Sequence, residues 1–164
     1  MASGNESSAS AKLCFVLAGL EAGMLAGLVM LAWLAAASAF QHRSVWAVPN
    51  LLATTFYGES ALRQSFGAKT LAGLALHLFV YSLLGAAFGI VVQHRGTRLR
   101  LTLLGILSAL AWHYFSFGFF WKTVNPLVML YSPDRPMLVG HLLYGGLLGR
   151  FPDFLRSVEK GLTL

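Results

Sequence analysis

Residues 13–40 read LCFVLAGLEAGMLAGLVMLAWLAAASAF, a run in which Glu21 is the single charged side chain. A helix crosses the hydrocarbon core of a bilayer with about 20 mostly apolar residues, and this run is longer. Further apolar runs cover 70–93 and 101–121, and a shorter one covers 137–149. The sequence therefore predicts an all-α integral membrane protein with about four transmembrane helices.

The composition and charge agree with this class. Hydrophobic residues make up 57% of the chain and charged residues only 11%, whereas soluble domains carry about 25% charged residues. The net charge is +6, but the basic residues lie mostly at the ends of apolar runs, where they anchor helices near lipid headgroups. No basic stripe with interleaved aromatic residues occurs in a polar segment, so we expect no nucleic-acid partner.

Glycines in the first apolar run repeat at intervals of four residues. Gly19, Gly23 and Gly27 therefore share one helix face, where small residues let another backbone approach closely. The same spacing relates Gly145 to Gly149, and Gly85 follows a histidine and a tyrosine on its own face. We expect these faces to pack helix against helix, within the chain or against a partner.

Four polar or mixed segments separate or flank the predicted spans. Residues 1–11 are small and polar and predict a disordered tail, and 156–164 predict a cytoplasmic tail. Residues 44–66 predict an amphipathic interfacial segment, with Pro49 expected to break any helix that continues from Trp46. Residues 122–136 predict a second proline-broken interfacial loop.

The positive charges predict an orientation in the membrane. The short turn before 101 and the C-terminal segment are both basic, and cytoplasmic segments carry an excess of Lys and Arg. We therefore expect both termini to be cytoplasmic and the membrane to be a bacterial inner membrane.

The two halves of the chain share a pattern that predicts a duplicated two-span unit, with copies at 12–93 and 101–155. Two spans return the chain to its starting side, so the copies would be parallel, with an axis along the membrane normal. The matching pairs are Leu31-Ala32-Trp33 with Leu110-Ala111-Trp112, Val48-Pro49-Asn50-Leu51 with Val124-Asn125-Pro126-Leu127, Tyr57 with Tyr131, and His77-Leu78-Phe79 through Gly85 with His141-Leu142-Leu143 through Gly149.

Three histidines fall inside predicted spans, where ionisable residues are rare and costly. The topology puts His77, His113 and His141 at similar depth, with Tyr81 and Tyr144 beside two of them. These residues could bind a metal, or two of the histidines could ligate a haem. In the alternative, each neutral histidine bonds a neighbouring tyrosine, serine or carbonyl and fixes the helix register.

Glu21 is the one carboxylate within a predicted span, and it points nearly opposite the glycine face. It could carry protons or ions in a small transporter or channel, together with the histidines. The alternative is a carboxyl near the headgroups or bonded to another helix. No nucleophile–base pair, phosphate loop or carboxylate dyad appears, so we expect no enzyme activity. The leading prediction is an accessory, scaffolding, lipid-binding or cofactor-binding subunit of a membrane assembly, or a homo-oligomer.

Overall fold

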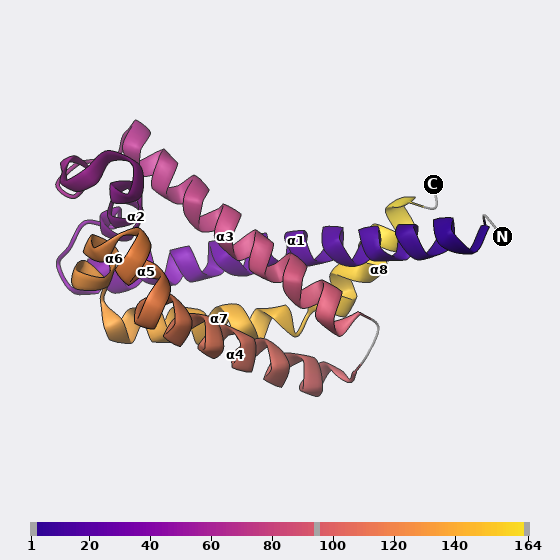
Figure 1. Cartoon of the computed structure of the whole chain (residues 1–164). Coiled ribbons are helices and arrows are strands. Elements are labelled where there is room, and N and C mark those ends of the chain that lie inside the picture. Colours follow the sequence, from indigo (N-terminus) through magenta and orange to yellow (C-terminus); the bar gives the residue numbers. More distant parts are fainter. Residues whose placement is uncertain (1–2, 94–95, 163–164) are drawn as a thin grey trace.

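The computed structural model describes residues 3–93 and 96–162, and in these residues every regular element is helical. The longest helices run lengthwise through the molecule, one of them crossing the others obliquely, with short helical segments at both ends (Figure 1). The elements are α1 (Ser3–Phe40), α2 (Ala47–Tyr57), η1 (Gly58–Ala61), α3 (Ala68–Val92), α4 (Arg98–Phe115), η2 (Ser116–Phe120), α5 (Trp121–Val124), α6 (Pro126–Tyr131), α7 (Asp134–Leu148) and α8 (Phe151–Leu162).

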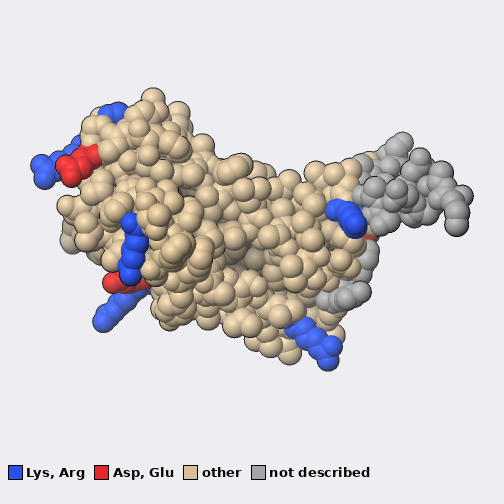
Figure 2. All heavy atoms as spheres, viewed as in Figure 1, with Lys and Arg blue, Asp and Glu red and all other residues tan. Residues whose placement is uncertain are grey.

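Three stretches of helix are long and apolar enough to cross a membrane, which indicates a membrane protein. They are Ala11–Phe40, Ala68–Val92 and Arg98–Val124, the last formed by α4, the π-helical turn η2 and α5 in succession. Helix α7 packs beside α1 and α4 but has only 15 residues. On the face shown in Figure 2, Lys, Arg, Asp and Glu gather towards the two ends, and a wide uncharged band lies between them.

Glycines bring the long helices into contact in two pairs. A side chain on Gly19 or Gly23 of α1 would overlap the backbone of α3 at Gly85. In the other pair, Gly145 of α7 faces the backbone of α4 at Gly105 in the same way. The glycine faces predicted from the sequence are therefore contact faces between helices of this chain.

Short helices close the end of the molecule opposite the termini, which we call the loop end (Figure 1). Asn50 in α2 is buried; its side-chain amide donates to the Gln64 carbonyl at 2.7 Å, and it accepts a bond from the Thr70 hydroxyl at 2.7 Å. Asn125 donates to the hydroxyls of Thr54 and Thr55 at 2.7 and 3.0 Å. These bonds tie α2 to α3 and to the segment before α6.

The structure corrects two expectations about the segments outside the spans. Residues 3–11, expected to be disordered, continue α1, because a helix that has already formed extends by one hydrogen bond for each residue added. Pro49 does not break the helix after Trp46; it lies in the first turn of α2, where backbone N–H groups have no helical partner to lose. Residues 151–162 form α8, so the segment predicted as a cytoplasmic tail is helical as far as Leu162, and the side of the membrane on which it lies stays a prediction.

Candidate functional site: a buried polar cluster beside an apolar crevice

A chain of hydrogen bonds links α3 to α7 in the middle of the bundle. His141 Nδ1 lies 2.8 Å from the carbonyl oxygen of Met137, and His141 Nε2 lies 2.9 Å from the hydroxyl of Tyr81. A carbonyl only accepts, so Nδ1 carries the proton and donates to it. Nε2 of this neutral imidazole is then an acceptor, and the Tyr81 hydroxyl donates to it.

Two further bonds extend this cluster. The Tyr144 hydroxyl donates to the carbonyl of Tyr81 at 2.7 Å. His77 Nε2 donates to the carbonyl of Gly27 at 3.1 Å, and the His77 ring lies 4.4 Å from the Tyr81 ring, centroid to centroid. Gly27 of α1 therefore makes two contacts with α3. Its missing side chain allows Tyr81 to pack closely, and its carbonyl accepts the hydrogen bond from His77.

His113 lies at the edge of the same cluster. Its ring is 4.8 Å from the ring of His141, centroid to centroid. Its Nδ1 atom is buried and, among the described residues, is the one buried side-chain nitrogen or oxygen without a hydrogen-bond partner. The three histidines predicted at one depth are thus brought together, with Tyr81 between His77 and His141.

The arrangement favours hydrogen bonding over ligation of a metal or haem. Both ring nitrogens of His141 and one of His77 are occupied by the bonds above. Within 3–93 and 96–162, no three His, Cys, Asp or Glu side chains are grouped so that they could hold a metal ion. The hollow bordered by His77 and His141 has a volume of about 20 Å³, room for about one water and far less than a porphyrin needs.

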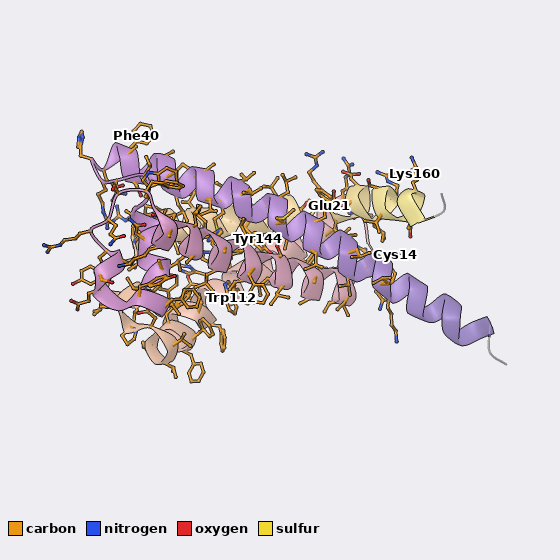
Figure 3. The ribbon with its side chains drawn as sticks, turned by 90° about the horizontal axis from the view of Figure 1, so that it is seen from above. Cys14, Glu21, Phe40, Trp112, Tyr144 and Lys160 are labelled. Atoms are coloured by element: carbon orange, nitrogen blue, oxygen red, sulfur yellow. The ribbon has the colours of Figure 1, made fainter. Side chains whose placement is uncertain are left out.

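Glu21 lies apart from the histidines. It is exposed on the outward face of α1, whereas Trp112 and Tyr144 lie towards the other helices of the bundle (Figure 3). The neighbouring outward residues Leu17, Met24 and Leu25 are exposed as well. The structure therefore does not join Glu21 and the three histidines into one polar path.

An apolar crevice of about 340 Å³ lies between α3 and α4 and reaches α7 at its floor. Its walls run about 12 Å along α4, from Leu104 to Trp112. Trp112 also borders the small hollow beside His141, and Tyr144 of the polar cluster lines the crevice, so the crevice and the cluster adjoin. The lining residues are Leu84, Ala87, Phe88, Val91, Val92, Leu104, Ser108, Ala109, Trp112, Tyr144 and Leu148.

A charged cluster lies at the end of the molecule that carries the termini, which we call the terminal end. Arg98 of α4 contacts Asp153 of α8 at 2.7 Å, Arg156 contacts it at 2.5 Å, and Arg150 at 3.7 Å. The bonds from Arg98 and Arg156 lower the pKa of the Asp153 carboxyl below its ordinary value. The carboxylate therefore stays ionised at neutral pH, and the pairing weakens only when acid protonates it.

Sequence reasoning found the histidines and tyrosines but did not identify the crevice. The residues that line it come from three helices, and no local pattern in the sequence brings them together. No known protein family, curated protein or solved structure matches this chain. The function must therefore be inferred from the geometry alone.

Proposed function

We propose that this chain is a four-span membrane protein, built from two related helix pairs, that binds the acyl chain of a membrane lipid in the crevice between α3 and α4. The observation that carries this proposal is the crevice itself, an apolar space of about 340 Å³ in a chain whose other long helices meet at backbone contact. In this reading α7 is the fourth span and crosses a locally thinned bilayer.

Equivalent contacts in the two helix pairs support the repeat. The match of Trp33 with Trp112 places Gly23 at the position of Thr102, and the match of His77 with His141 places Gly85 at the position of Gly149. Gly23 meets Gly85 between α1 and α3, and Thr102 meets Gly149 between α4 and α7. The same positions therefore form the crossing in both pairs.

The loop end repeats a backbone contact as well. The N–H of Asn50 donates to the carbonyl of Trp46 at 2.9 Å, and the N–H of Asn125 donates to the carbonyl of Trp121 at 3.0 Å. Both asparagines are buried and both donate their side-chain amides to neighbouring segments. The four-residue spacing of a tryptophan and a buried asparagine in both halves agrees with a common ancestor unit.

The repeat explains why the crevice is open. In the proposed repeat, α1 corresponds to α4 and α3 corresponds to α7. The contact seam between α1 and α7 is therefore equivalent to the contact seam between α4 and α3. The first seam is closed: Met30 and Trp33 of α1 pack on Gly140 of α7, and the Trp33 indole N–H donates to the carbonyl of Pro136 at 2.9 Å. At the second seam Leu76 stands in place of the glycine beside the small hollow, and Ala109 stands in place of Met30 on the wall of the crevice, so the space beside Trp112 is left open.

The chemistry of the lining favours an acyl chain as the occupant. The walls are almost entirely aliphatic or aromatic, and the Tyr144 hydroxyl is already bonded to Tyr81. An empty apolar crevice in contact with a bilayer would be filled by lipid, because the atoms that line a void lose their dispersion contacts. A helix from a partner, about 10 Å across with its side chains, is too wide for this space.

Filling the crevice should displace the lipid. Ala87 lies on the α3 wall of the crevice. We expect Ala87→Phe to reduce by about tenfold the fraction of purified protein that carries one lipid in native mass spectrometry. The reason is that two methylene groups of the acyl chain that lose their burial already account for about 1.6 kcal/mol of binding free energy. Ala111→Phe adds the same bulk to an exposed site on α4 outside the crevice and should leave lipid retention unchanged. Equal retention by the wild-type protein and Ala87→Phe would contradict the proposal.

Glu21 supports a second role, as a contact to another subunit of a membrane assembly. It lies about 9 Å along α1 from Phe15, which packs at the level of α8, and its carboxyl faces outward. A carboxyl in hydrocarbon is costly unless a neighbouring helix offers a hydrogen-bond donor or a basic group. Such a neighbour would come from a partner chain, since α1 turns this face away from its own bundle.

The assembly role and the transport alternative predict different effects at Glu21. If Glu21 holds a partner, Glu21→Leu should reduce co-purification in mild detergent by at least about fivefold, while Glu21→Gln, which can still hydrogen bond, should retain about half. The control Glu59→Gln lies at the loop end and should have no effect. Proton- or ion-coupled flux by the pure protein in liposomes, abolished by Glu21→Gln, would instead support a small transporter.

A further inference from the structure

A second cavity, of about 360 Å³, lies at the terminal end of the molecule between the start of α4 and helix α8. Arg98 and Arg156 lie on its walls, and Gln93 and Gly96 border it from the turn between α3 and α4. Leu101 and Leu155 are buried beneath it. The cavity is thus polar on its rim and apolar at its base.

The charges around this cavity favour an anion. Three guanidinium groups, those of Arg98, Arg150 and Arg156, share the single carboxylate of Asp153, so two positive charges stay uncompensated in this group. Glu159 also lines the cavity and reduces the excess to one. The three arginine side chains are 65–69% exposed, so their remaining N–H donors face outward. Planar guanidinium groups bind phosphate through paired hydrogen bonds.

The cavity and the crevice follow one another along the same two helices. On α3 the crevice ends at Val92 and the cavity begins at Gln93. On α4 the cavity is lined by Leu101 and the crevice begins at Leu104, one turn further. Arg98 lies about 9 Å along the helix axis from Leu104. This is the order in which a phospholipid presents its headgroup and its acyl chain.

We propose that the cavity binds the phosphate headgroup of an anionic phospholipid whose acyl chain occupies the crevice between α3 and α4. The inference rests on the proposed function, because it names the class of lipid that the crevice takes. Arg98 and Arg156 select the negative headgroup, and Asp153 holds the two arginines at the rim. The lipid belongs to the leaflet at the terminal end, where anionic headgroups would meet the basic residues.

The test compares phosphatidylglycerol with phosphatidylcholine of identical acyl chains, each added to delipidated protein and counted by native mass spectrometry at low salt. Wild-type protein should prefer phosphatidylglycerol by about fivefold, since the one excess positive charge near a headgroup contributes about 1 kcal/mol. Arg98→Gln with Arg156→Gln should abolish the preference while phosphatidylcholine still binds. The control variant, Arg100→Gln with Lys12→Gln, removes two exposed charges that do not line the cavity. It should keep most of the preference for phosphatidylglycerol.

Asp153→Asn separates headgroup binding from a structural role of the ion pairs. This variant breaks the same ion pairs as the double arginine variant but leaves both guanidinium groups free, so the preference should stay or increase. A loss of preference in Asp153→Asn as large as in the arginine variant would overturn the inference. So would stabilisation by inorganic phosphate alone equal to that by phosphatidylglycerol, which would show that the cavity takes a free anion.

The two proposals fail in different ways. If wild-type protein binds both lipids equally, the crevice still holds an acyl chain and only the headgroup inference is wrong. If it binds neither lipid, the proposed function is wrong and the headgroup inference with it. If phosphatidylglycerol binds equally well to wild-type protein and to Ala87→Phe, the headgroup cavity binds lipid without the crevice, and the combined site is wrong.

Discussion

Gly145→Ala should destabilise the protein by about 2–3 kcal/mol, the cost of overpacking a tight contact with little room to relax. A Cβ atom at this position would overlap the carbonyl of Gly105 and lie 2.7 Å from Cα of Ile106, both on α4. Backbone atoms cannot turn aside as a flexible side chain can, so α4 and α7 would have to separate. Unfolding by denaturant in a non-ionic detergent, followed by circular dichroism, measures the change.

The adjacent residue provides the matched control. Gly146 is in the same helix, and nothing lies within 4 Å of the position that its Cβ atom would take. Gly146→Ala should therefore leave stability unchanged or raise it by up to about 1 kcal/mol, because alanine favours helix over glycine. If both variants lose the same stability, close packing at Gly145 does not hold α4 against α7.

The bond between Tyr81 and His141 should be worth about 1 kcal/mol in a double-mutant cycle, in the range found for hydrogen bonds between membrane helices. Tyr81→Phe leaves Nε2 of His141 without a donor, and His141→Leu leaves the buried Tyr81 hydroxyl without its acceptor. Each single change should cost about 1–3 kcal/mol, because an unsatisfied buried polar group keeps its desolvation penalty. The double variant should lose less than the sum.

A tyrosine outside the cluster controls for loss of the hydroxyl itself. Tyr114 is 67% exposed on α4, so Tyr114→Phe should change the free energy of unfolding by less than about 0.5 kcal/mol. Strict additivity of Tyr81→Phe and His141→Leu would show that these side chains do not depend on one another. The cluster would then not link α3 to α7 energetically.

The spans and the faces they use follow closely from local sequence. The length of an apolar run decides whether a helix can cross hydrocarbon, and residues four apart share a face in any helix. For this reason the sequence alone predicted that Gly23, Gly85 and Gly145 lie on contact faces. It also predicted that the three histidines lie at one depth. Helix at residues 3–11 and in α8 was not predicted, because an apolar run marks the hydrocarbon core and not the point where helical hydrogen bonding ends.

The candidate site depended on how the helices turn relative to one another, which no single helix encodes. The sequence placed Tyr81 and His141 on inward faces, but only the packing of α3 against α1 and of α7 against α4 brings the hydroxyl to 2.9 Å from Nε2. The same packing leaves Glu21 facing outward.

The long apolar run at 13–40, with its glycines and one carboxylate, thus specified by itself a membrane helix and the face on which it packs. Which partner each face met was decided by tertiary structure, because the rotation of a helix follows from all its contacts together. Gly140 of α7 allows Met30 and Trp33 of α1 to pack closely, whereas the small side chains of Ala87 and Ala109 leave the crevice between α3 and α4 unfilled. The proposed lipid site therefore arises from the volumes of side chains that meet only when the helices pack.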